Sequence, residues 1–270
     1  MAGASMKDIK LRIKSVESTM QITKAMQLVA TSKLRRAKER METSKPFAVI
    51  AQQAISAVAA KCDDSHIPFV HPRPVKRRCY VVIAGDRGLA GGYNSNVFKA
   101  VAAHTEGIDY CVLPLGRKAV ERFHRYGVES VSDDYTRVEG MSVGACRKLA
   151  DKLIDGYLTE KYDEVWIVYT SFLNMMSQEV QVDRLLPVEK AEEDPARTPV
   201  DTIYELEPME TLMKVMPDFI SGRLYSALCD SFASEVSARR TAMDSATKNA
   251  GEMISDLKLK FNRARQGAIT

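Results

Sequence analysis

The sequence predicts an α/β protein in which a long antiparallel coiled coil of the N- and C-terminal helices carries a central Rossmann-like α/β domain. Both ends of the 270-residue chain keep a heptad spacing of apolar and small residues over many turns. The middle alternates short β-branched runs with helical segments, which is typical of a largely parallel sheet covered by helices. We therefore expect a coiled-coil helix over residues 1–60, an α/β domain over 75–190 and a second coiled-coil helix over 208–270.

The N-terminal segment has the pattern of one long helix. Residues 6–44 contain neither Pro nor Gly. Positions spaced alternately by four and three residues are Ile9, Ile13, Val16, Met20, Thr23, Gln27, Ala30, Leu34, Ala37 and Met41. Pro46 lacks the N–H that an interior helical residue donates, so we expect a kink or an interruption there. The spacing resumes weakly beyond it, with Ala48, Ala51, Ile55 and Val58.

The C-terminal segment mirrors this spacing. Its positions are Cys229, Ala233, Val236, Arg240, Met243, Thr247, Ala250, Ile254, Leu257, Phe261 and Ala264. At ~1.5 Å per residue each helix is longer than a globular domain requires, and a single such helix could not bury its own stripe. We therefore expect the two stripes to form the seam of an antiparallel pair.

The seam itself is unusually polar for a coiled coil. Thr23, Gln27, Arg240 and Thr247 occupy positions where Leu or Ile would be more stabilising. Apolar side chains lie outside the seam instead, at Ile22, Met26, Leu28 and Val29. A coil that is weak inside and apolar outside is expected to need further partners.

The central segment predicts alternating strands and helices. Strands are expected over residues 78–84, 110–115, 164–171 and 179–186, and helices over 94–104, 117–126 and 142–160. The last two strands, joined through residues 174–177, are expected to form a hairpin. Residues 191–199 contain acidic residues and proline, which predicts a surface loop.

A Gly-rich stretch, VVIAGDRGLAGGYNSN at residues 81–96, follows the first of these strands. A strand, a Gly-rich turn and a helix is the arrangement in which backbone amides bind phosphate. The spacing of Gly85, Gly88, Gly91 and Gly92 matches neither dinucleotide nor P-loop motifs, and no Lys-Ser or Lys-Thr pair follows. The stretch is thus a tight strand-to-helix connection, a phosphate site or a partner-facing loop, and the spacing favours the first.

Composition and motifs exclude several classes of function. The net charge of +4 is only weakly basic, and no aromatic residues interleave the basic cluster at 33–40, which argues against nucleic-acid binding. That cluster is a solvated face or a site for an acidic protein. The five scattered cysteines argue against a disulfide framework and fit a reducing compartment. No histidine or carboxylate pattern indicates catalysis, so we expect no cofactor and no metal.

Three motifs together resemble the gamma subunit of bacterial-type F-type ATP synthases. The N-terminal stretch contains I-T-K-A-M at residues 22–26 and V-A-x-S-K at 29–33. DRGLAGGYNSN at 86–96 is similar to D-R-G-L-C-G-G-x-N-x-N, with Ala90 in place of the usual Cys. The C-terminal stretch contains A-R-x-x-A-M, A-T-x-N-A and N-x-x-R-Q-x-x-I-T in order within residues 238–270.

The resemblance implies a central rotor shaft that couples proton-driven rotation of the c-ring to ATP synthesis and hydrolysis on the beta subunits. Its partners would be the alpha and beta subunits, the epsilon subunit and the c-ring, with no nucleotide bound to the shaft itself. The complex would lie at the cytoplasmic face of the bacterial plasma membrane, with this subunit peripheral. The resemblance also implies a C-terminal helix that extends several turns beyond Thr270.

The resemblance further implies which residues meet partners. Contacts with beta subunits are expected from Lys24, Met26, Lys33, Arg35, Arg36, Asp86, Arg87, Gly88, Leu89, Ala90, Arg239, Arg240, Arg265 and Gln266. Tyr204 and Glu205, in a segment similar to the family's Y-E-P-x-P, are expected at the foot near the c-ring and epsilon. Two other functions stay open, a nucleotide-dependent enzyme that uses the Gly-rich turn and a free-standing coiled-coil adapter.

Overall fold

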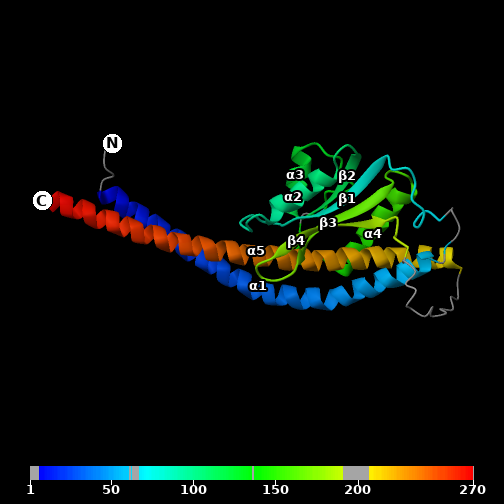
Figure 1. The fold of residues 1–270 in the computed structure, drawn as a ribbon, viewed down its shortest axis with the longest axis horizontal. Helices are drawn as coiled ribbons and strands as arrows, with labels where there is room; N and C mark the ends of the chain where they lie inside the picture. Colours follow the sequence, from blue (N-terminus) through cyan, green and yellow to red (C-terminus); the bar gives the residue numbers. More distant parts are fainter. Residues whose placement is uncertain (1–5, 61, 63–66, 136, 191–206, 270) are drawn as a thin grey trace.

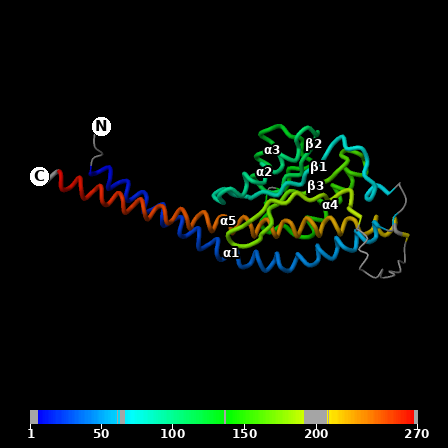
Figure 2. The backbone as a smooth tube through the Cα atoms, viewed as in Figure 1, coloured from blue at the N-terminus to red at the C-terminus, as the bar shows by residue number. Residues whose placement is uncertain are grey.

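Two long helices dominate the computed structural model, which describes residues 6–60, 62, 67–135, 137–190 and 207–269. Helix α1 spans Met6–Ala60 and helix α5 spans Pro208–Ile269. They run antiparallel along the length of the molecule, and the start of α1 and the end of α5 lie at the same tip (Figure 1). The α/β domain packs beside the other half of the pair, so the coil protrudes alone at the tip (Figure 2). The predicted pairing of the terminal helices is confirmed.

The α/β domain contains a four-stranded sheet of order β2-β1-β3-β4. Its strands are β1 (Arg77–Ile83), β2 (Asp109–Leu115), β3 (Glu164–Phe172) and β4 (Gln178–Leu186). Its helices are α2 (Tyr93–His104), α3 (Arg117–Arg125) and α4 (Val143–Leu158). β1 pairs in parallel with β2 and β3, and β4 closes the expected antiparallel hairpin with β3. Each predicted strand and helix of the domain is found within two residues of its expected bounds.

The sheet is covered on both faces. Cys79, Val81 and Ile83 of β1 face a large core that includes residues of α1, α4 and α5. Tyr80 and Val82 face the opposite core, beneath α2 and α3. Alternate residues of one strand therefore enter two cores, which is why the strand is a continuous apolar run in the sequence.

Helix α1 continues through Pro46, so the expected interruption is wrong. Pro46 and Glu42, whose carbonyl loses its helical donor, are both exposed, so water can satisfy that carbonyl. Ser44 and Ala48 on either side remain buried against the rest of the molecule. The helix bows smoothly as a whole (Figure 1). Tertiary packing on both sides of the proline thus outweighs one missing hydrogen bond.

The predicted seam lies between the two helices. Every seam position described on α1 up to Met41, and on α5 from Cys229 to Ala264, is buried or half-buried. Its polar members pair with residues of the other helix: the hydroxyls of Thr23 and Thr247 lie 2.8 Å apart, and Gln27 Nε2 donates to Asp244 Oδ1 at 2.9 Å. Across the described ranges, no helix is long and apolar enough to cross a membrane.

Candidate functional site

The Gly-rich loop, residues 84–92, joins β1 to α2 and packs against α5. The Gly85 N–H donates to Asn94 Oδ1 at 2.8 Å, which fastens the start of the loop to the first turn of α2. A Cβ atom at Gly85 would lie 2.7 Å from Glu235 Oε1. A larger residue at this position would require the Glu235 carboxylate to move, so glycine lets the loop approach α5 as the side chains stand, and the geometry supports the interpretation of a tight strand-to-helix connection.

Asp86 ties the Gly-rich loop to the segment before α4. Its carboxylate accepts the Val138 N–H at 2.9 Å and the Glu139 N–H at 3.2 Å. Glu139 in turn forms an ion pair with Lys33 of α1, with Nζ and Oε1 2.5 Å apart. Both side chains of this pair are about half exposed, so its contribution to stability is small. The carboxylate of Asp86 is thus used within the chain.

Arg239 holds the loop from the α5 side. Its guanidinium donates to the Gly88 carbonyl at 3.3 Å and to the Arg87 carbonyl at 3.4 Å. It also forms an ion pair with Glu235 at 2.5 Å, and the two side chains are only 15% and 5% exposed. Burial raises the pKa of the Glu235 carboxyl, while the charge of Arg239 opposes that shift. Arg239 therefore faces the interior of its own chain.

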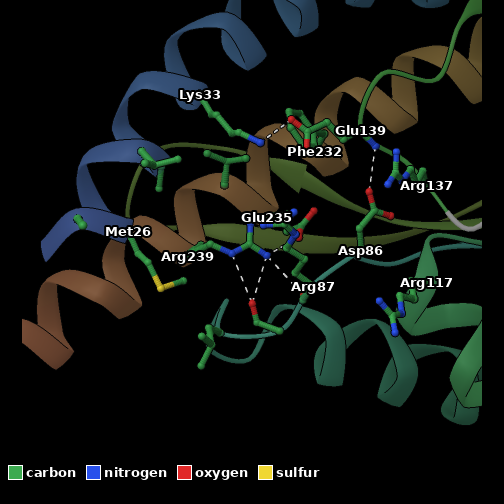
Figure 3. A pocket seen from close by; sticks show the side chains of 16 residues that line it. Met26, Lys33, Asp86, Arg87, Arg117, Arg137, Glu139, Phe232, Glu235 and Arg239 are labelled. Atoms are coloured by element: carbon green, nitrogen blue, oxygen red, sulfur yellow. Dashed lines mark hydrogen bonds and ion pairs between the residues drawn. The ribbon is translucent and has the colours of Figure 1, made fainter. Parts of the chain in front are cut away.

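A cavity of about 980 Å³ lies between α1, the Gly-rich loop and α5 (Figure 3). Part of its lining is apolar, from Met26 and Val29 of α1 and Phe232 of α5. Charged side chains complete the lining, mostly cationic, at Lys33, Arg87, Arg117, Arg137, Arg239, Asp86, Glu139 and Glu235. Among its described lining residues there is no histidine, cysteine or serine. Its chemistry fits contact with a partner that carries both apolar and acidic groups.

The structure gathers half of the predicted contact residues at this cavity. Met26, Lys33, Asp86, Arg87, Gly88, Leu89 and Arg239 all line it. Ala90 is buried beneath the loop, while Lys24, Arg35 and Arg36 are exposed on α1 outside the cavity. Arg240 faces α1, and Arg265 and Gln266 lie near the far end of α5. Tyr204 and Glu205 lie outside the described residues.

The sequence reasoning missed several residues of this site. Arg117, Arg137 and Glu139 come from α3 and from the segment before α4, and no local pattern links them to the loop. Glu235 lies four residues before Arg239, a spacing that favours an ion pair on a helix and could have drawn attention to it. Which way that pair faces depends on the domain packed against α5.

Sequence comparisons match nearly the whole chain. The family model described as ATP synthase matches residues 5–270. The chain is 44% identical to the ATP synthase gamma chain of Ruminococcus albus, over 99% of this chain and 94% of that one. It is 39% identical to the ATP synthase gamma chain of Desulforamulus reducens, over 99% of this chain and 95% of that one.

Solved structures share the fold at lower identity. A rotor chain of the Euglena gracilis mitochondrial ATP synthase superposes with a TM-score of 0.69 over all of both chains, at 18% identity. A central-stalk chain of the Tetrahymena thermophila mitochondrial ATP synthase superposes with a TM-score of 0.62, at 23% identity, over 83% of this chain and 99% of that one. The family model and the relatives above 30% identity show that the chain belongs to the ATP synthase gamma chain family.

Proposed function

We propose that this chain is the central rotor shaft of an F-type ATP synthase. It couples rotation of the c-ring to the conformational changes by which the beta subunits make or hydrolyse ATP, and it carries no catalytic site itself. The observation that carries the proposal is a protruding coil with an unpartnered apolar surface, in a chain of the gamma family. The complex places this subunit peripherally, at the cytoplasmic face of the bacterial plasma membrane.

The protruding part together with the turn of α1 at the rim of the cavity is here called the upper coil, and it comprises residues 6–29 of α1 and 243–269 of α5. Ile22, Leu28 and Val29 are 58%, 64% and 57% exposed, and Leu259 on the facing helix is 59% exposed. Exposed apolar surface of this kind marks an interaction site. A ring of alpha and beta subunits around the upper coil supplies the burial that two helices alone do not.

Contacts with the beta subunits are proposed at two levels. Along the upper coil they come from Lys24, Arg265 and Gln266. At the cavity they come from Met26, Lys33 and the Gly-rich loop from Asp86 to Ala90, with Arg239 behind the loop. Outside the cavity they come from Arg35 and Arg36 of α1 and from Arg240 of α5. Tyr204 and Glu205 are proposed to meet the c-ring and epsilon at the foot. The family resemblance implies an acidic loop on each beta subunit that moves during the catalytic cycle. Exposed cations attract such a loop weakly, by roughly 0–1 kcal/mol per pair, so each contact can break as the shaft rotates from one resting angle to the next.

The experiment is ATP-driven proton pumping per ATP hydrolysed, in complexes reconstituted with alpha, beta, epsilon and the membrane sector. Met26→Lys places a permanent extra cation at the half-buried rim of the cavity and should lower this ratio strongly. Arg36→Ala removes one exposed, redundant cation and should lower it little. Normal pumping by Met26→Lys together with uncoupling by Arg36→Ala would contradict the proposal, as would failure of the unmodified chain to assemble.

A further inference from the structure

One stretch of α5, residues 231–241, fastens the α/β domain to the shaft. On one side the hydroxyls of Ser231 and Tyr93 share a hydrogen bond of 2.7 Å, and Arg239 donates hydrogen bonds to the carbonyls of Arg87 and Gly88. The Glu235 carboxylate, itself buried, keeps the guanidinium in place. This side of the helix therefore carries the Gly-rich loop.

The other side of the same stretch carries the β3–β4 hairpin, whose tip is residues 173–177. Ser237 Oγ donates to the Met175 carbonyl at 3.1 Å. Arg240 Nη1 lies 3.3 Å from Met175 Sδ, while its Nε donates to Thr31 Oγ1 of α1 at 3.2 Å. Two loops of the α/β domain and the other helix of the coil, α1, thus meet within about three turns of α5.

The Gly-rich loop is presented outward from this attachment. Leu89 has a φ of 63°, a left-handed conformation that is uncommon for a non-glycine residue. Its side chain is 64% exposed, whereas the next residue, Ala90, is 2% exposed. A strained backbone persists only where its surroundings impose it, and such strain gathers at functional sites. Here the imposed conformation points the apolar side chain of Leu89 toward solvent.

We propose that Arg239 is a positioning residue that fixes the Gly-rich loop at one angle on the shaft, so that Leu89 meets each beta subunit at a defined point of the rotation. The inference rests on the proposed function. Arg239 Nη2 contacts the two successive carbonyls and the Glu235 carboxylate, while Nε donates to the Gly88 carbonyl from a second position. A lysine side chain carries a single nitrogen and cannot make both sets of contacts at once. A guanidinium that served as a surface contact would be exposed, whereas that of Arg239 is enclosed.

The test compares Arg239→Ala and Arg239→Lys with Arg125→Ala in reconstituted complexes. Arg125 is a suitable control because it is an exposed arginine at the end of α3 that does not line the cavity. Both Arg239 variants should lose several-fold in protons pumped per ATP and broaden the dwell angles seen in single-molecule rotation. Arg125→Ala should match the unmodified chain in both measurements. Amide exchange over residues 86–92 should quicken only in the Arg239 variants.

Leu89→Gly gives a second route that does not depend on the stability of the Arg239 variants. Glycine adopts the left-handed conformation freely, so the fold should be at least as stable, yet coupling should fall because the contact is gone. A lower melting temperature in the Arg239 variants with unchanged coupling and dwell angles would show a merely structural role and overturn the inference. Restored coupling in Arg239→Lys would overturn it too. If complexes that contain the unmodified chain did not pump protons, the proposed function itself would be contradicted.

Discussion

The two halves of α5 bury their side chains in different ways. In the lower half, residues 211–240, every position from 219 onward is buried or half-buried, because the sheet and α4 cover one side and α1 the other. In the upper coil the buried positions are Met243, Ala250, Ile254 and Leu257, one stripe facing α1 alone. The same helix is thus part of a domain core at one end and half of a two-stranded coil at the other. From residue 219 to 240 the lower half is covered by its own chain, whereas the upper half has only α1 beside it and leaves its other faces to a surrounding partner.

The largest expected effect is the difference in the free energy of unfolding when the same Leu→Ala substitution is made in each half. Leu224→Ala, at a fully buried position of the lower half, should lower the free energy of unfolding by about 2–5 kcal/mol. Leu257→Ala, in the upper coil, should cost less than about half of that, because the side chain has neighbours on one helix only. Urea unfolding of the isolated chain measures both. Equal losses would contradict the comparison.

Acid should next distinguish the α/β domain, which covers the lower half of α5, from the upper coil. Asp163 is buried, which alone would raise its pKa, but the N–H groups of Lys76 and Arg77 and the guanidinium of Arg73 together hold the pKa below its ordinary value. A depressed carboxyl pKa contributes stability that is present above the unfolded value, roughly 3.9, and is lost as the pH falls through the folded value.

Replacement of the carboxylate tests this sign. Asp163→Asn should lower stability at pH 7 and flatten its dependence on pH below about 4. Asp244 of the upper coil also has a lowered pKa, through a hydrogen bond from Lys248, but this pair is exposed. Asp244→Asn should therefore change the acid profile little. The melting temperatures of both variants should be measured from about pH 2 to about pH 7, a range that includes the titration of carboxylates. A larger change in the pH dependence of stability for Asp244→Asn than for Asp163→Asn would contradict this prediction.

The smallest expected effect concerns the polar seam. Thr23→Val combined with Thr247→Val replaces both partners of one hydrogen bond by groups of the same shape. Such paired replacement is nearly neutral or stabilising, here by less than about 1 kcal/mol. Thr23→Val alone should destabilise slightly, because the Thr247 hydroxyl then keeps only its bond to the Met243 carbonyl and loses the one across the seam. Thermal unfolding of the isolated chain checks the order of the three proteins. A double variant less stable than the single one would show that the polar pair itself holds the upper coil.

The seam and the sheet could be predicted because they follow local periodicity. The spacing from Ile9 to Met41 places a stripe on one helix face, and each strand of the sheet is an apolar run bounded by turn residues. The continuity of α1 through Pro46 could not be predicted, since it depends on packing to either side of the proline. The direction of Arg239 could not be predicted either. The spacing of residues along α5 does not indicate that the Gly-rich loop, whose Gly88 is 151 residues earlier in the sequence, covers the face that carries Arg239.

Hydrogen exchange of the chain, free and bound to a ring of alpha and beta subunits, tests the central claim most directly. In the free chain, amides of the upper coil should exchange much faster than those of residues 211–240, because only one helix covers each. On assembly, protection should rise over residues 6–29 and 243–269 and stay unchanged in the lower half. Equal protection of both halves in the free chain, or an upper coil whose exchange does not slow on assembly, would contradict the account.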